Sequence, residues 1–258
     1  MTLPVRVQEI RTRPGRANRY ADRMSYARHK ATILVIFCRR PAIGIGKQRL
    51  ASQIGAVPAA DIATLLLATT LEDAVSWPGP VVLAPAEAAD SAWAATLLKR
   101  SLSVIPQPAG NLGERLQTVD RTVRAGQAEA VIYIGSDAPV LTESDYSAAR
   151  MALLRHDVVL APALDGGVTL MGARCPWPEL ADLPWSSERL YASLNERCTT
   201  HGLRVASLTA GYDVDVAADL HRLCADLKTD RRPARQMLYR RLCSLGYSAN
   251  RDSAAQRS

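Results

Sequence analysis

The sequence predicts an α/β fold in which a mostly parallel sheet is flanked by helices within a single domain. Short apolar runs rich in β-branched residues alternate with longer segments of helical periodicity, which is the pattern of βαβ units. The runs are apolar throughout, as expected for strands that are buried on both faces. With 258 residues, 48% of them hydrophobic, the chain can bury one full core of this kind.

The first half of the chain is expected to supply three strands and three helices. Residues 32–38 (TILVIFC) form a continuous apolar run and predict a buried first strand. Residues 59–75 place apolar side chains on one side at helical spacing and predict a helix. The other elements expected here are strands at 80–84 and 102–105, a helix at 88–99 and a helix that Asn111 caps and that ends near residue 125.

The second half continues the alternation. A strand at 131–134 precedes a helix that Thr142 caps, and two further strands lie at 158–161 and 168–171. A loop rich in proline then leads to a helix that a serine at 186 or 187 caps and that ends near residue 198. The last expected elements are a strand at 205–208, a helix from about 217 and a basic helix at about 233–243.

Charge and composition divide the chain into three parts: a basic extension (1–30), the α/β domain (31–228), and a C-terminal basic helix with a polar tail (229–258). Residues 1–30 carry +6 of the net charge of +7 and have no sustained period, which predicts disorder. Contact with nucleic acid or a membrane surface, and a transit peptide, remain open. We favour a start at Met24 instead, so nucleic acid is not an expected partner.

Cysteine usage and hydropathy indicate a cytoplasmic protein. The five cysteines are widely spaced, include no CxxC pair and are odd in number, which argues against a disulfide framework or a zinc knuckle. No apolar run approaches the length of a membrane span, and the N-terminus has no secretory signal core. The sequence leaves the oligomeric state open.

Two aspartates follow predicted strands, at the positions where such sheets bind ligands. Asp137 comes directly after the strand 131–134, and Asp165 follows the strand 158–161 in an Asp-Gly-Gly turn. The carboxyl ends of these strands are expected to bring both carboxylates to one edge. Each aspartate also has a structural explanation as a turn residue.

A basic, glycine-containing loop follows the first strand. It reads RRPAIGIGKQR over residues 39–49, with four basic side chains that suit an anion such as a diphosphate. A P-loop would need glycine at Pro41 and serine or threonine at Gln48, and a dinucleotide fingerprint would need glycine at Arg49. Both motifs are therefore excluded, and a solvated basic loop is the structural alternative.

Six ordered motifs carry a resemblance to a known family. FCRRPAIGIGKQRLA, QPAGNLGERL, IGSDAPVL, DVVLAPALDGG, WSSE and DVDVAADL resemble the radical-SAM/selenodomain-associated transferases, linked to arsenosugar clusters, of the GT-A nucleotide-diphospho-sugar transferase superfamily. Guanylyltransferases that act on phospholactate, phosphoglycerate or the molybdenum cofactor are similar. The resemblance covers about residues 31–225. It departs at Gln48, where the family has threonine or serine, and at Val168, where it has tyrosine.

The resemblance implies a GT-A-like, Rossmann-type domain that binds a nucleotide with Mg²⁺ or Mn²⁺. It implies metal ligation by Asp137 and Asp215, although Asp215 could equally be a helix N-cap, and a phosphate clamp that includes Lys47. Asp165 would act as general base toward an acceptor hydroxyl or would orient that hydroxyl. The remaining implied residues are phosphate- or nucleotide-binding Arg39, Gly44, Gly46, Arg49, Gln107, Gly110, Leu112 and Gly113, with Arg40 assisting, and acceptor-side Gly166, Gly167, Trp185 and Ser186.

Two reactions and one non-catalytic role follow as hypotheses. The first is transfer of a sugar from a nucleotide-diphospho-sugar to a small-molecule acceptor. The second is transfer of a nucleoside monophosphate from a nucleoside triphosphate to a phosphorylated small molecule, which releases pyrophosphate. A non-catalytic nucleotide- or partner-binding scaffold is the third, because Gln48 and Val168 depart from the family pattern.

Overall fold

The computed structural model describes residues 31–248 of the chain. The expectations for residues 1–30 and for the end of the polar tail lie outside the described residues. Within 31–248 no helix is both long enough and apolar enough to cross a membrane.

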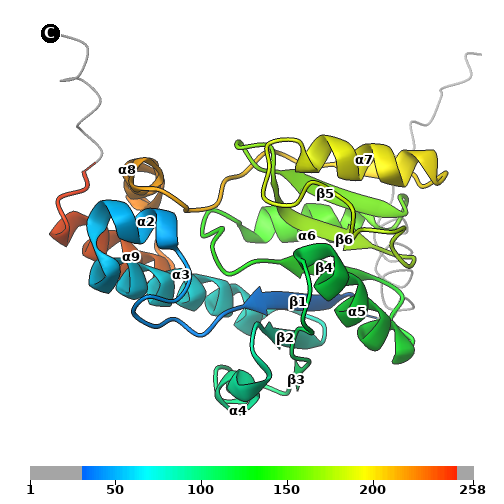
Figure 1. The fold of residues 1–258 in the computed structure, drawn as a ribbon, viewed down its shortest axis with the longest axis horizontal. Coiled ribbons are helices and arrows are strands. Elements are labelled where there is room, and N and C mark those ends of the chain that lie inside the picture. Colours follow the sequence, from blue (N-terminus) through cyan, green and yellow to red (C-terminus); the bar gives the residue numbers. More distant parts are fainter. Residues whose placement is uncertain (1–30, 249–258) are drawn as a thin grey trace, which may run out of the picture. The chain divides into compact units, whose positions relative to one another are not determined.

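One seven-stranded sheet forms the centre of the described region, in the order β3-β2-β1-β4-β6-β5-β7 (Figure 1). All its pairings are parallel except those of β6, which runs antiparallel to β4 and β5. The predicted α/β fold with a mostly parallel sheet is thus confirmed. The strands are β1 (Ile33–Cys38), β2 (Val81–Pro85), β3 (Ser103–Val104), β4 (Val131–Ile134), β5 (Val158–Pro162), β6 (Val168–Ala173) and β7 (Val205–Ser207).

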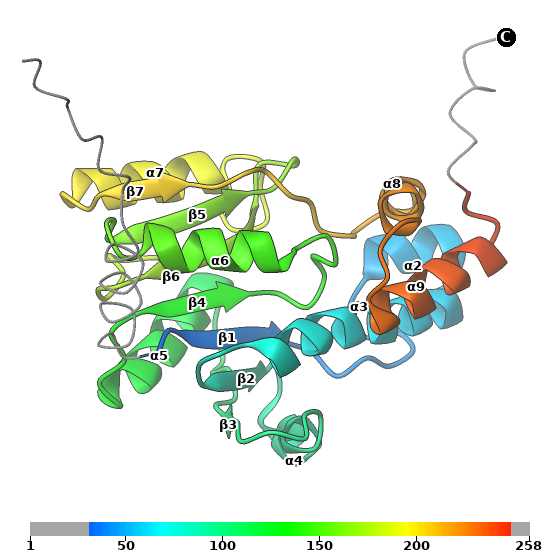
Figure 2. The ribbon, with the colours of Figure 1, turned by 180° about the vertical axis from the view of Figure 1, so that it is seen from behind.

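Helices cover both faces of the sheet (Figures 1 and 2). Apolar side chains of α3, α4 and α6 pack on one face, and those of α5 and α7 pack on the other. A third apolar cluster joins α2, α3, α8 and α9. The bounds are α2 (Gln48–Ile54), α3 (Ala56–Ser76), α4 (Ser91–Ala95) with the 3₁₀ turn η1 (Ala88–Asp90) before it, α5 (Leu112–Ala125), α6 (Glu143–Ala152), α7 (Leu190–Thr200), α8 (Ala217–Leu227) and α9 (Pro233–Ser244).

Helix α5 begins where the sequence predicts, because its first turn satisfies its own backbone donors. The Asn111 side chain accepts from the backbone N–H of Glu114 at 3.1 Å, and the Glu114 carboxylate accepts from the backbone N–H of Asn111 at 2.7 Å. This reciprocal capping box fixes the helix start. Thr142 and Asp145 form the same arrangement at the start of α6.

The connectivity reverses direction between β1 and β4. From β1 the chain builds outward to β2 and β3, and then returns to place β4 on the other side of β1. A crevice outside the carboxyl ends of the strands is expected at such a switch point, and ligands of open α/β sheets bind there. The loop after β1 and the Asp137 turn after β4 both start at this point.

Candidate functional site

A cavity of about 470 Å³ opens at the carboxyl edge of β4 and β5. Its walls come from the ends of β1 and β4, from β6 beside the Asp-Gly-Gly turn, from the first turns of α5 and from residues 185–190. Carboxylate residues line one part of the cavity, and apolar residues line another. The carboxylate residues are Asp137, Asp165, Glu188, Asp213 and Asp215.

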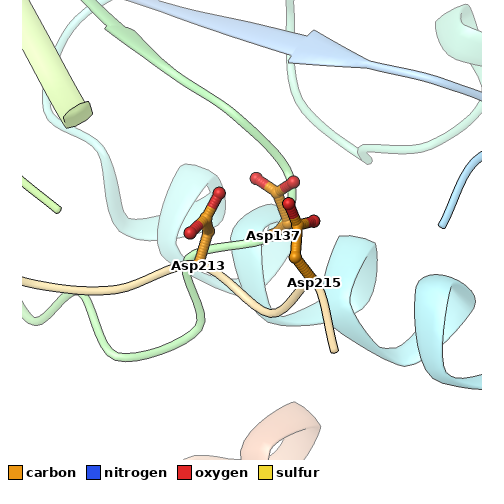
Figure 3. Close-up of side chains that lie close together, drawn as sticks. All are labelled: Asp137, Asp213 and Asp215. Atoms are coloured by element: carbon orange, nitrogen blue, oxygen red, sulfur yellow. The ribbon is translucent and has the colours of Figure 1, made fainter. Parts of the chain in front are cut away.

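Three of these aspartates form a cluster (Figure 3). One carboxylate oxygen from each of Asp137, Asp213 and Asp215 lies within 4.8 Å of the others, and all three residues are half-buried. Asp137 comes from the turn after β4, whereas the other two come from the segment between β7 and α8. The cluster joins segments that are far apart in the sequence.

Backbone hydrogen bonds hold the two segments together. The N–H of Val214 donates to the carbonyl of Asp137 at 3.0 Å, which places the residues on either side of Val214 next to the β4 turn. The carboxylate of Asp219 accepts from the N–H groups of Asp215 and Val216, both at 2.8 Å, at the start of α8. Asp219 therefore caps this helix, and the side chain of Asp215 is left to face the cluster.

Lys47 lies between two carboxylates of the cluster. Its Nζ is 2.8 Å from Oδ2 of Asp137 and 2.9 Å from Oδ1 of Asp215, and Nη2 of Arg49 is 2.5 Å from Oδ2 of Asp215. Lys47 has a left-handed backbone (φ +46°) at the N-terminus of α2, a conformation that costs energy for a residue with a side chain. The backbone of Lys47 is therefore strained in the conformation that directs its ammonium group at the aspartates.

The electrostatics of the cluster suit a divalent cation. Burial, with the charges of Asp137 and Asp215 beside it, raises the pKa of Asp213 to about 6. Burial alone would lower the pKa of Lys47, but Asp137 and Asp215 raise it above its usual value. Oxygen ligands from carboxylates are those that Mg²⁺ and Mn²⁺ prefer. Asp137, Asp213 and Asp215 therefore fit such an ion.

The Asp165-Gly166-Gly167 turn forms a second edge of the cavity. Oδ1 of Asp165 accepts from the N–H of Gly167 at 2.9 Å, so this carboxylate closes its own turn. Gly166 has φ +87°, and a Cβ there would lie 1.9 Å from the carbonyl oxygen of Glu188. The N–H of Tyr191 donates to the carbonyl of Gly166 at 2.9 Å. The turn is therefore packed directly against the start of α7.

The other part of the cavity is apolar. Nε1 of Trp185 donates to the carbonyl of Leu180 at 2.7 Å, and the hydroxyl of Tyr133 donates to the buried carboxylate of Asp120. Ser186, at the mouth, has a left-handed backbone (φ +61°). Its apolar lining includes Phe37, Leu112, Val168 and Trp185, together with the almost fully buried Leu116, Tyr133 and Met171.

Several residues that the resemblance implies for nucleotide binding do not line this cavity: Arg39, Gly44, Gly46, Gln107, Gly110 and Gly113. Nε2 of Gln107 donates to the carbonyl of Ala84 at 2.7 Å. A Cβ on Gly113 would lie 2.2 Å from the carbonyl oxygen of Leu180, so this glycine lets α5 pack against the loop before Trp185. Arg40 lies 3.6 Å from a carboxylate oxygen of Asp90.

The structure shows the surroundings of Gln48 and Val168, the two residues that depart from the pattern of the resemblance. Nε2 of Gln48 donates to the carbonyl of Gly44 at 2.7 Å and so ties the basic loop to the first turn of α2. Val168 lines the cavity at the start of β6.

Asp213 is the site residue that the sequence reasoning did not single out. The signal was its spacing, since Asp213 and Asp215 flank one valine in an extended segment that leads into a helix. The hydrogen bond from Val214 to Asp137 directs both aspartates toward the cluster.

Residues 67–187 match the model of a family described as an uncharacterized protein conserved in bacteria (DUF2064). No curated protein is detectably similar in sequence to the chain.

A solved structure shares this fold. A candidate nucleotide-diphospho-sugar transferase from Desulfovibrio desulfuricans G20 is similar with a TM-score of 0.76 at 23% identity, over 85% of this chain and 99% of that one. A cytidylyltransferase from Leptospira borgpetersenii has a TM-score of 0.48 at 13% identity, over 84% and 95% of the two chains. The chain is thus similar to the DUF2064 family over residues 67–187 and shares its fold with the Desulfovibrio structure.

Proposed function

We propose that this protein is a nucleotide-dependent transferase that moves a sugar from a nucleotide-diphospho-sugar to a small-molecule acceptor. The observation that carries the proposal is the aspartate cluster beside Lys47 and Arg49, at the switch point of the sheet and at the edge of a cavity. Ligands of open α/β sheets bind at this position. The fold shared with the Desulfovibrio protein supports the same assignment.

Each side of the site has a distinct chemical task. Asp137, Asp213 and Asp215 hold Mg²⁺ or Mn²⁺, which neutralises charge on the diphosphate leaving group when it is bound. Lys47 and Arg49 bind phosphate oxygens through charge-assisted hydrogen bonds, with the loop of Arg39, Gly44 and Gly46 close by in sequence. The nucleoside lies toward residues 107–113, which include Gln107, Gly110, Leu112 and Gly113.

The acceptor side is the turn that contains Asp165. This carboxylate accepts the proton of the attacking group as general base, using the oxygen that the Gly167 N–H does not occupy. Gly166 and Gly167 shape the turn, and Trp185 and Ser186 border the acceptor.

Nucleotidyl transfer is the second candidate, and one observation favours it. Arg39 follows β1 as an exposed residue, and no ion pair of Arg39 is present among residues 31–248. The stem of Arg39 lies against Gly46, next to Lys47 in the sequence, and a guanidinium group on this loop would suit the additional charge of a triphosphate donor. The products separate the two reactions, because sugar transfer releases a nucleoside diphosphate and nucleotidyl transfer releases pyrophosphate.

A non-catalytic scaffold is the remaining alternative. A scaffold would gain nothing from Lys47, a residue with a strained backbone whose ammonium group contacts two carboxylates. This arrangement argues that the donor site is retained.

We place the protein in the cytoplasm and treat residues 31–228 as the transferase domain.

A thermal-shift panel tests the proposal. Nucleoside triphosphates and nucleotide sugars are added with and without Mg²⁺ or Mn²⁺ to the wild type, to Asp137→Ala and to the exposed control Glu129→Gln. A ligand at about 100 times its dissociation constant stabilises the fold by about 2.7 kcal/mol. We expect metal-dependent stabilisation of the wild type and control but not of Asp137→Ala. If no nucleotide shifts any variant, the scaffold role replaces the transferase.

A further inference from the structure

We propose that the acceptor is an uncharged or cationic molecule with an apolar body, and not a phosphorylated or carboxylated one. The inference rests on the proposed function, because it assigns to the acceptor the part of the cavity beside Asp165, apart from the donor side at Arg49 and Leu112. Two properties of the cavity support it. The lining is negatively charged, and the polar groups of its aromatic side chains are already hydrogen-bonded within the protein.

The charge of the lining is strongly negative. Asp165 and Glu188 border the cavity in addition to the three aspartates of the cluster. Among the described residues that line it, Arg49 is the only basic one, and its guanidinium group already contacts Asp215. An anionic acceptor would enter without a free cationic partner and would be repelled by Asp165 and Glu188, which no metal ion at the cluster neutralises.

The aromatic side chains offer only apolar surface. The hydroxyl of Tyr133 is donated to Asp120, and Nε1 of Trp185 is donated to Leu180. Both residues have therefore used their polar groups within the protein, and the half-buried Trp185 presents carbon to the cavity, whereas Tyr133 is almost fully buried. With the half-buried Phe37 and Val168, Trp185 forms an apolar surface that favours an apolar group. A volume of about 470 Å³ suits a compact molecule with one such group.

The chemistry of transfer needs a nucleophilic atom with a free lone pair, so a cationic acceptor reacts through a hydroxyl group or through an amine that has first lost a proton. An acceptor O–H or N–H gives its proton to Asp165 while its oxygen or nitrogen bonds to the anomeric carbon of the donor. The bond from that carbon to the diphosphate oxygen breaks at the same time, so the products are the glycosylated acceptor and a nucleoside diphosphate. The proton then leaves Asp165 for water. A phosphorylated acceptor, which the nucleotidyl-transfer hypothesis requires, is disfavoured at this cavity.

Three probes of one shape test the inference. 3-Phenylpropan-1-ol, 3-phenylpropylamine and 3-phenylpropanoate share an apolar body and differ in the charge of the head group. Binding to the full chain is followed by tryptophan fluorescence, with Mg²⁺ and a nucleoside diphosphate present. We expect the alcohol and the amine to bind at least about tenfold more tightly than the carboxylate. Repulsion between the negative head group and one neighbouring carboxylate of the protein weakens binding by about that factor.

Variants locate the effect. The double substitution Asp165→Asn with Glu188→Gln should reduce the preference for the amine over the carboxylate to within about threefold, whereas Glu129→Gln should leave it unchanged. Trp185→Phe, which keeps an aromatic ring in the wall, should abolish most of the fluorescence change. A carboxylate that binds as tightly as the amine, or a signal that survives in Trp185→Phe, overturns the inference.

The experiment separates this inference from the function it rests on. If a nucleotide with metal stabilises the protein and the carboxylate binds best, the acceptor class is wrong and the transferase proposal stands. If the amine and alcohol bind as ranked but no nucleotide stabilises the protein, the transferase proposal fails, and with it the identification of these molecules as acceptors.

Discussion

At the scale of single residues, two glycines allow the cost of backbone strain to be measured separately from the cost of a steric clash. Gly166 and Gly202 both have positive φ, +87° and +74°, but a Cβ on Gly202 would meet nothing within 4 Å, whereas one on Gly166 would meet Glu188. Gly202→Ala should cost about 1 kcal/mol of unfolding free energy from the backbone alone. Gly166→Ala should cost at least about 1 kcal/mol more. Urea unfolding of both variants measures the difference, and equal costs would show that the contact with Glu188 is relieved easily.

Asp213 is expected to contribute to cation affinity as much as its neighbours. Asp213→Asn keeps the shape of the side chain but removes one of the three close carboxylates, so Mn²⁺ should bind roughly tenfold or more weakly. Electron paramagnetic resonance of free Mn²⁺ measures this affinity. Glu129→Gln, an exposed change elsewhere, should bind Mn²⁺ as the wild type does. Unchanged affinity in Asp213→Asn would limit the metal site to Asp137 and Asp215.

The sequence predicted part of this site for a clear reason. Asp137 lies in the turn after β4, and the basic loop after β1 leads to Lys47. Because β1 and β4 are neighbours at the switch point, the segments that follow them are expected at the same edge of the sheet. Asp213 depends instead on the path of a segment between β7 and α8, which a backbone hydrogen bond to Asp137 determines. No local pattern encodes that contact, and the roles of Arg39 and Gln107 stay predictions.

At the scale of elements, a buried arginine joins α9 to the turn that carries Asp137. Arg235 has no exposed surface, and its guanidinium group lies 3.0 Å from a carboxylate oxygen of Glu72 and 2.7 Å from one of Asp73. It also donates to the carbonyls of Pro139 and Leu141 at 3.0 and 3.1 Å. The C-terminal helix is therefore attached to α3 and to the backbone that follows Asp137.

Removing this arginine should destabilise the protein strongly. Arg235→Met removes the ionic partner of Glu72 and leaves Arg232 as the remaining ionic partner of Asp73. It also leaves the carbonyl of Pro139 without its donor, and breaking buried pairs of this kind typically costs about 3–5 kcal/mol. Arg240→Met changes the same residue type to the same product on the exposed side of α9 and should cost less than about 1 kcal/mol. Urea denaturation compares the unfolding free energies of the two variants, provided that their m-values are equal. Similar costs would mean that α9 contributes little to the fold.

Strands were predicted more accurately than helices. Apolar runs ended within two residues of the observed strands, because burial on both faces makes the central strands β1, β2 and β5 apolar along their length. The helix expected at 88–99 is only the short α4 behind a 3₁₀ turn, and α2 was not predicted as a separate helix. Gly55, with φ +95°, separates α2 from α3. The expected serine cap at 186 or 187 is wrong, because Ser186 is left-handed and α7 begins only at Leu190, without a side-chain cap. Both boundaries come from backbone conformations that residue periodicity does not report.

At the scale of the whole molecule, the sheet, the cavity and the aspartate cluster all lie within residues 31–248. A chain that starts at Met24 should therefore have the same melting temperature and the same metal-dependent nucleotide binding as the full chain. Calorimetry and the thermal-shift panel measure both quantities. A loss of binding in the shortened chain would assign a ligand contact to the basic extension and would reopen a role in nucleic-acid contact.

Lys47 also gives the protein its own occupant for the cation site. Because the ammonium group is attached to the chain and bonds to Asp137 and Asp215, it competes with any dissolved cation at an effective concentration of about millimolar or higher. A singly charged ion offers these carboxylates no more charge than the ammonium group does, so Na⁺ and K⁺ gain nothing by displacing it. The ammonium group of Lys47 therefore excludes Na⁺ and K⁺ from the site, whatever coordination geometry these ions prefer. Only an ion of higher charge gains by displacing it.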